Sequence, residues 1–219
     1  GVGGVTPLFE PPSRIGNKDY VVFGQPYKVW NDIEQYSEEG TASWYGPGFH
    51  GLYTSNGELY DQESISAAHK NLPLPSYLKV TNLESGKAIV VRVNDRGPFL
   101  YNRVMDLSYA AATALDYANK GTARVRVERL TNQEIADALA RAGFSDIVLR
   151  REKHVVHYPD LKTLLRAVKA IGAQNVGEGG RSGMMGRAAW RQLEAAYENY
   201  REPAGLPASY DVILAYGTL

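Results

Sequence analysis

Alternation of apolar and polar residues between residues 38 and 128 is typical of β-strands. Residues 78–82 and 89–93 alternate in this way on either side of a turn sequence at 84–87, which predicts a β-hairpin. Residues 123–128 alternate again and predict a half-buried strand. Short strands joined by tight turns favour a small β-barrel.

A helical period appears once within this region, at residues 106–117. Ser108 or Asp106 is the expected N-cap, and Gly121 lies beyond the expected C-terminus. The apolar face of this helix is formed by Leu107, Ala111, Ala114 and Leu115.

Beyond residue 129 the pattern changes to helices that alternate with strands. The segment 131–134 has the form of a capping box and opens a helix that is expected to reach Ala142. The remaining elements are expected as a strand at 147–158, helices at 160–171 and 187–200, a glycine-rich loop at 172–186 and a strand at 210–216.

These patterns predict three parts in the chain. Residues 1–37 are rich in Gly, Pro and aromatic residues and form an N-terminal arm or linker. Within it, residues 20–30 are either a short hairpin or partly ordered chain. Residues 38–128 form the mainly β domain, and residues 129–219 form an α/β segment.

The composition excludes several classes of function. The chain has 219 residues, of which 44% are hydrophobic and 22% charged, an ordinary globular balance. Its formal net charge is zero, so no basic surface predicts binding to nucleic acid or to an anionic membrane. It has no Cys, which removes thiolate nucleophiles and Cys-based zinc sites. No apolar run approaches the ~20 residues that span a bilayer.

Two densely polar segments, 54–61 and 93–98, lie where strands of the barrel region are expected to end. With the segment 66–69 between them, they supply one histidine and three carboxylates, His69, Glu58, Asp61 and Asp95. Cleavage of a glycosidic bond needs a carboxylic acid that protonates the leaving oxygen and groups that stabilise developing positive charge. Carboxylates on one face of a barrel meet that need.

Each of these residues also has a purely structural explanation. Asp95 lies in a tight turn, where Asp often bonds to its own backbone. Glu58 follows Asn-Gly, so a solvated turn accounts for it, and Asp61 fits a turn or a cap. His69 fits a buried structural histidine, and the aromatic pair 44–45 fits the core as well as a sugar platform.

Six segments of the barrel region carry specific motifs. They are GTASWYG at 40–46, TSNGELYD at 54–61, AAHKNLP at 67–73, VTNLESG at 80–86, VRVNDRGP at 91–98 and LSYAAA at 107–112. In this order they resemble the rare lipoprotein A family of bacterial cell-wall lytic transglycosylases. The resemblance covers residues 38–128.

The resemblance implies a six-stranded double-psi β-barrel, related to expansins, that cleaves the β-1,4 bond between N-acetylmuramic acid and N-acetylglucosamine. No water attacks, because the 6-hydroxyl of the muramic acid closes on C1 and leaves a 1,6-anhydro end. One carboxyl therefore serves first as acid and then as base. Asp95 matches the catalytic acid, and Glu58 matches a second required carboxylate. Further sugar contacts are expected from Asp61, His69, Asn94, Arg96, Trp44 and Tyr45.

The resemblance also implies the surroundings of the reaction. The partner is the peptidoglycan glycan strand, the location is the periplasm or outer membrane, and neither a cofactor nor a metal is implied. Arg96 would disfavour a protonated Asp95 if the two side chains met. Because neighbours on a strand point to opposite faces, Arg96 is expected to point away.

The sequence departs from the family in several places. Leu52 and Tyr53 replace a pair that is usually basic or polar, and Ser55 replaces the usual Ala. The peptidoglycan-binding SPOR domain that usually follows the barrel is not recognisable, and no lipoprotein Cys is present. Septal targeting and outer-membrane anchoring therefore have no support in the sequence.

Motifs of a different kind lie in residues 131–219. HYPDL at 157–161, IGAQN at 171–175 and LPASYDV at 206–212 resemble the C-terminal portion of the malonyl-acyl-carrier-protein methyltransferase of biotin synthesis. The glycine-rich motif that binds S-adenosylmethionine belongs to the other half of that family and is absent here. This segment is therefore expected to be catalytically inactive. Arg181 and Arg187 are either contacts for an acidic carrier protein or, as the favoured interpretation, solvated loop charges.

The sequence leaves three candidate functions. The leading one is a lytic transglycosylase that uses Asp95 and Glu58. The second is a glycan-binding barrel without activity, and the third is a fragment of a methyltransferase that carries a barrel domain. Formation of anhydro product separates the first two, and binding of S-adenosylmethionine tests the third.

Overall fold

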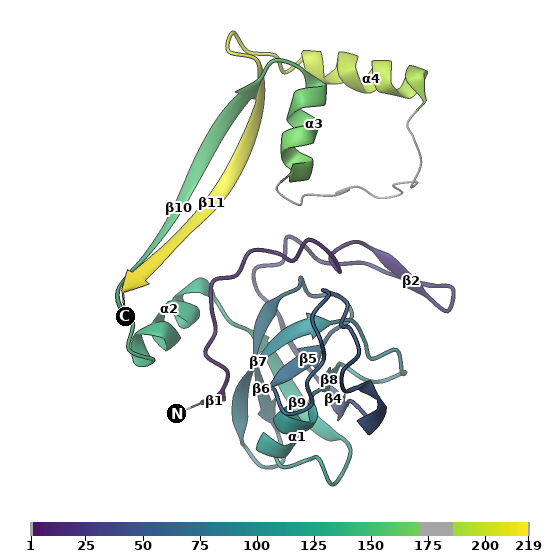
Figure 1. The fold of residues 1–219 in the computed structure, drawn as a ribbon, viewed down its shortest axis with the longest axis vertical. Helices are drawn as coiled ribbons and strands as arrows, with labels where there is room; N and C mark the ends of the chain where they lie inside the picture. Colours follow the sequence, from purple (N-terminus) through teal and green to yellow (C-terminus); the bar gives the residue numbers. More distant parts are fainter. Residues whose placement is uncertain (1, 171–185, 219) are drawn as a thin grey trace. The chain divides into compact units, whose positions relative to one another are not determined.

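A computed structural model describes residues 2–170 and 186–218 of the chain (Figure 1). Residues Gly1–Ser145 and Asp146–Thr218 form two compact units. The predicted glycine-rich loop at 172–186 and Arg181 lie outside the described residues, apart from Gly186 at the end of the loop. None of the helices in the described residues is long and apolar enough to cross a membrane.

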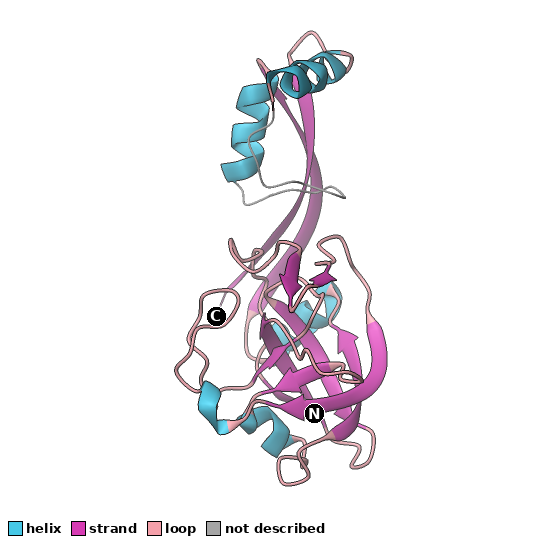
Figure 2. Ribbon diagram, turned by 90° about the vertical axis from the view of Figure 1, so that its right-hand side faces the viewer, coloured by secondary structure: helices cyan, strands magenta, loops and turns pink. Residues whose placement is uncertain are grey.

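The first unit contains a closed β-barrel, visible in Figure 2 as the group of strongly curved strands. Its strands are β4 (Ser37–Trp44), β5 (Ser66–Ala68), β6 (Ser76–Asn82), β7 (Ala88–Asp95), β8 (Met105–Leu107) and β9 (Ala123–Arg129). They lie in the order β7-β5-β8-β4-β9-β6, and β6 pairs back with β7 to close the barrel. The pairs β4–β8 and β5–β7 are parallel, and the other barrel pairs are antiparallel. This closed mixed sheet confirms the predicted double-psi β-barrel.

Alternate residues of the long strands fill the barrel. Ile89, Val91 and Val93 of β7 point into one apolar core. The facing strands contribute Leu78 and Val80 from β6 and Ala123, Val125 and Val127 from β9. Arg92 and Asn94 alternate with the inward-pointing residues of β7, so both side chains lie on the outer side of this strand.

The structure corrects the predicted helix at 106–117. Met105–Leu107 is strand β8, and the helix α1 spans only Tyr109–Ala114. Asp106 and Leu107 pair with β4 and β5, so barrel closure takes the residues that helical spacing alone assigned to a first turn. Ser108 is the N-cap, because its hydroxyl accepts a hydrogen bond from the Ala111 N–H.

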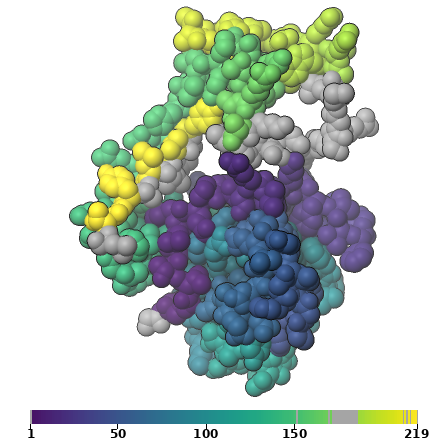
Figure 3. Space-filling view, in the orientation of Figure 1, coloured from purple at the N-terminus to yellow at the C-terminus, as the bar shows by residue number. Residues whose placement is uncertain are grey.

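The N-terminal arm lies on the barrel surface, where Figure 3 shows it in purple. Its first strand, β1 (Gly3–Gly4), pairs in parallel with β7. A Cβ on Gly4 would lie 2.2 Å from the Val90 carbonyl oxygen, so the close approach requires glycine. Further along, β2 (Tyr20–Val22) and β3 (Gln25–Tyr27) form the short hairpin that was one of the two predicted alternatives.

After the barrel, helix α2 (Asn132–Arg141) begins with the predicted capping box between Thr131 and Glu134. The second unit contains β10 (Ser145–Tyr158), which pairs with β11 (Leu206–Thr218), and helices α3 (Leu161–Ala170) and α4 (Arg187–Glu198). Leu161, Leu164 and Leu206 form its small apolar core. The predicted helices and strands of this half are confirmed within the described residues. Its resemblance to a methyltransferase stays a prediction.

Candidate active site

Asp95 ends strand β7, at a register shift where β5 pairs with it, and its carboxylate is held by four donors. Oδ1 accepts hydrogen bonds from the Ser55 N–H at 2.9 Å, the Ser55 hydroxyl at 2.7 Å and the Arg96 N–H at 2.8 Å. Oδ2 accepts one hydrogen bond, from the Tyr45 hydroxyl at 2.9 Å.

The two oxygens of Asp95 therefore differ in what they can still accept. A carboxylate oxygen offers about two lone-pair directions, and three donors already occupy those of Oδ1. Oδ2 has one donor and keeps a lone pair. Burial, followed by the charge of Asp95, raises the pKa of Tyr45 well above its ordinary value, so Tyr45 remains a donor. A proton carried by Asp95 belongs on Oδ2.

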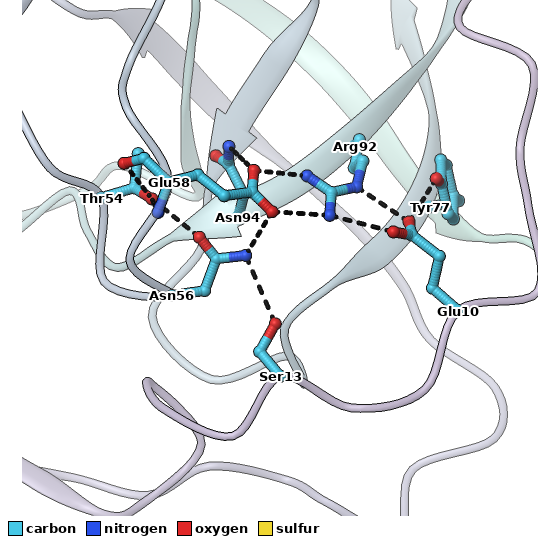
Figure 4. Close-up of polar contacts among 8 residues, drawn as sticks. All are labelled: Glu10, Ser13, Thr54, Asn56, Glu58, Tyr77, Arg92 and Asn94. Atoms are coloured by element: carbon cyan, nitrogen blue, oxygen red, sulfur yellow. Dashed lines mark hydrogen bonds and ion pairs between the residues drawn. The ribbon is translucent and has the colours of Figure 1, made fainter. Parts of the chain in front are cut away.

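Glu58 lies in a second polar cluster on the outer face of β7, shown in Figure 4. Both of its oxygens bond to the guanidinium of Arg92, at 2.6 and 2.7 Å. The Asn94 and Asn56 side-chain amides donate to the same carboxylate at 3.0 and 2.9 Å. The hydrogen bonds from Arg92 lower the pKa of Glu58 to about 2 despite partial burial, and the two amides add to the effect. Glu58 is ionised at neutral pH.

One tight loop, residues 54–58, connects the two carboxylates. The Thr54 N–H donates to the Glu58 carbonyl at 2.7 Å and closes the loop. Gly57 has a φ of 86°, a left-handed backbone conformation that favours glycine. Ser55 near the start of the loop holds Asp95, and Glu58 at its end accepts hydrogen bonds from the β7 side chains Arg92 and Asn94. The loop thus fixes both carboxylates relative to β7.

His69 is 2% exposed and has partners on both ring nitrogens. Nδ1 accepts from the Asn71 and Leu72 N–H groups at 3.0 and 3.1 Å. Because Nδ1 is an acceptor, Nε2 carries the hydrogen and faces the Tyr36 hydroxyl at 2.9 Å. The contacts of His69 thus fit the structural explanation, in which it braces the following loop.

Acid is expected to destabilise the barrel through His69. Burial lowers the pKa of His69 to about 3 in the folded state, against about 6.5 in an unfolded chain. Between these values the unfolded state binds more protons, so stability falls as the pH falls through this window. Thermal unfolding at about pH 7 and about pH 4.5 measures the effect. A His69→Gln variant is expected to lose less stability over this step, and an equal loss in both proteins would contradict the assignment.

The other predicted sugar contacts are placed as follows. Asp61 is exposed, and its carboxylate accepts hydrogen bonds from the Glu63 N–H and the Ser64 hydroxyl, as a turn residue does. Trp44 donates to the Ala118 carbonyl and packs partly buried against the core. Asn94 is buried and bonds to Glu58, and Tyr45 bonds to Asp95.

Arg96 points away from Asp95, as predicted. Its guanidinium donates to the carbonyl oxygens of Gly16, His69 and Leu72, which ties the N-terminal arm to the loop after β5. The Arg96 residue is buried, with 9% of its surface exposed. These hydrogen bonds therefore hold the two segments together.

Comparison with known proteins finds relatives of the barrel region. Residues 37–127 match a family described as lytic transglycolase. The endolytic peptidoglycan transglycosylase RlpA of Vibrio cholerae is 55% identical over 125 residues, which are 57% of this chain and 48% of that protein. RlpA of Pseudomonas aeruginosa strain UCBPP-PA14 is 61% identical over 109 residues, 50% of this chain and 32% of that protein. The barrel is RlpA-like.

The chain spans about half the length of the Vibrio cholerae RlpA and about a third of the Pseudomonas aeruginosa RlpA. Among solved structures, apo expansin of Clavibacter michiganensis aligns with a TM-score of 0.36 at 16% identity, over 53% of this chain and 57% of that one. The fold assignment depends on the strand pairing and the family match.

Sequence reasoning missed three residues of the RlpA-like site. Arg92 and Glu10 complete the cluster around Glu58. Asp106 on β8 is a third nearby carboxyl, because Ala68 pairs both with Asp95 and with Asp106. Burial raises the pKa of Asp106, although the hydrogen bond from Ser43 partly offsets the effect. Arg92 lies in the motif VRVNDRGP, at a position of the predicted strand that faces outward. That position could have identified Arg92 as a partner for a carboxylate of the site.

Proposed function

We propose that the RlpA-like barrel is a peptidoglycan lytic transglycosylase, with residues 38–128 as its catalytic domain. It cleaves the β-1,4 bond between N-acetylmuramic acid and N-acetylglucosamine and leaves a 1,6-anhydro end. The observation that carries this proposal is the paired arrangement of the two carboxylates. One oxygen of Asp95 accepts three hydrogen bonds and the other accepts one, while Arg92 keeps Glu58, which ends the loop that holds Asp95, ionised.

In the proposed reaction the protonated Oδ2 of Asp95 donates its proton to the glycosidic oxygen as the C1–O bond breaks. Positive charge then develops on C1 and the ring oxygen of the muramic acid. The 6-hydroxyl of the same sugar attacks C1 and returns its proton to Oδ2. The carboxyl is regenerated, no water is consumed, and Tyr45 and Ser55 keep the carboxyl oriented throughout.

The proposed role of Glu58 is electrostatic. A carboxylate whose pKa is lowered to about 2 carries no proton at neutral pH, so it is unsuited to be the acid. Its fixed negative charge suits the stabilisation of a cationic transition state.

Asp106 is a second candidate for the acid, because its pKa is raised by burial and it neighbours Asp95 across β5. A general acid near neutral pH needs such a raised pKa. The variant Asp106→Asn distinguishes the two: partial activity assigns the acid to Asp95, and complete loss assigns it to Asp106.

Peptidoglycan is the proposed partner, and the cell envelope that contains it is the proposed location. The periplasm or outer membrane is the finer assignment that the RlpA resemblance favours. Incubation of the purified chain with intact peptidoglycan, and with glycan stripped of stem peptides, tests the proposal by release of soluble fragments. Binding of either substrate without release would favour the glycan-binding alternative.

Replacing Ser55 with Ala is expected to lower kcat roughly fivefold with little change in KM, because one hydrogen bond of about 1 kcal/mol that orients Asp95 is lost. The Ser55 N–H still reaches Oδ1, which limits the effect. Steady-state kinetics on stripped glycan check this, and Ser55→Thr, which keeps the hydroxyl, is the matched control. An unchanged kcat in Ser55→Ala would show that the Ser55 hydroxyl does not contribute to catalysis.

A further inference from the structure

Two carboxylates share one guanidinium beside the proposed reaction centre. Arg92 donates from Nη1 and Nη2 to Glu58 and from Nε and Nη2 to Glu10, the last two at 2.8 and 3.1 Å. The Tyr77 hydroxyl also donates to Glu10. Figure 4 shows Arg92 lying between the two carboxylates.

All three groups are charged at neutral pH. Burial raises the pKa of Glu10, but the hydrogen bonds from Arg92 and Tyr77 and the charge of Arg92 outweigh it and hold that pKa below its ordinary value. The hydrogen bonds to Glu58 and then to Glu10 raise the pKa of Arg92, although burial lowers it. Arg92 therefore stays protonated. One positive and two negative charges leave the cluster with a net charge of about −1. Without Glu10, Arg92 and Glu58 would form a neutral pair.

The N-terminal arm holds Glu10 in place from both sides. Before it, the Val5 N–H donates to the Val90 carbonyl at 3.0 Å. After it, the Ser13 N–H donates to the Leu74 carbonyl at 2.8 Å, and Asn56 donates to the Ser13 hydroxyl. Two prolines, Pro11 and Pro12, stiffen the short connection. The arm thus delivers a fixed carboxylate from outside the residues that match the family.

We propose that Glu10 is a positioning residue of the active site, which takes part of the hydrogen bonding of Arg92 and so leaves the Glu58 cluster negatively charged toward the glycan. The arm is then part of the catalytic apparatus and not only a linker. This inference rests on the proposed transglycosylase function, in which a cationic sugar must be stabilised.

The test is steady-state cleavage of stripped glycan by the full chain carrying Glu10→Gln, which keeps the shape and removes the charge. We expect kcat to fall roughly tenfold with KM unchanged. The charge of Glu10 lies on the far side of Arg92 from Glu58, and partial solvation weakens its effect on the sugar. Glu84→Gln removes the same charge from a surface pair with Lys120 and is expected to leave both parameters unchanged.

The outcomes separate this inference from the function on which it depends. An active wild type with an equally active Glu10→Gln would overturn the role of Glu10 and leave the transglycosylase proposal intact. A variant with raised KM, or with a lowered melting temperature and unchanged kcat, would show that Glu10 only anchors the arm, which also overturns it. An inactive wild type would overturn both.

Discussion

Replacing Asp95 with Asn is expected to reduce the cleavage of glycan strands about a thousandfold, while the barrel stays folded. Asn cannot donate a proton to the glycosidic oxygen and then accept one from the 6-hydroxyl. The side-chain carbonyl oxygen of Asn can still accept hydrogen bonds from the Ser55 N–H, the Ser55 hydroxyl and the Arg96 N–H. The geometry of the loop is therefore expected to be retained. Release of soluble fragments measures the activity, and thermal unfolding measures the fold.

The matched control for this change is Asp116→Asn. Asp116 is a surface residue paired with Lys87, and its φ of 62° is a conformation that Asn adopts readily. Wild-type activity is expected there. Activity of Asp95→Asn within tenfold of the wild type would exclude Asp95 as the general acid and would favour Asp106 in that role.

The second large effect is expected from Glu58→Gln, which should lower kcat about a hundredfold and change KM little. The substitution removes the negative charge that is proposed to stabilise the transition state, and it leaves Arg92 paired with Glu10 as a neutral unit. Steady-state kinetics on stripped glycan separate the two parameters. A rise in KM with unchanged kcat would instead make Glu58 a residue of ground-state binding.

Glu58 and Glu10 also share Arg92, so their combined loss can be predicted from charge. Either single substitution leaves the cluster neutral and both together leave Arg92 uncompensated, so adding Glu10→Gln to Glu58→Gln should cost at least as much activity as Glu10→Gln costs alone. The double-mutant cycle that measures this uses the same kinetic assay. A negligible cost of Glu10→Gln in the Glu58→Gln background would contradict a direct electrostatic contribution from Glu10.

The sequence predicted the barrel and its two carboxylates because their signals are local. Alternating strands, the turn at 84–87 and the motif around Asp95 each occupy a short run of residues. The Ser108 cap and the Thr131 capping box are local in the same way, and both are confirmed.

The rest of the site depends on contacts between residues that are far apart in the sequence. Glu10 meets Arg92 across 82 positions, and Ser55 meets Asp95 across 40 positions. Nothing in the neighbourhood of Glu10 distinguishes it from a solvated carboxylate of a flexible arm. The helix at 106–117 was mispredicted for a related reason, since β8 exists only through its pairing with β4 and β5.

The most direct test of the account is the chemistry of the cleaved end, read by mass spectrometry after digestion of stripped glycan in ¹⁸O-labelled water. Attack by the 6-hydroxyl predicts ends that are one water lighter than hydrolysed ends and that contain no label, formed by the wild type and not by Asp95→Asn. Labelled reducing ends would show that water attacks and would contradict the proposed mechanism, and no new ends from a folded wild type would contradict the proposed activity itself.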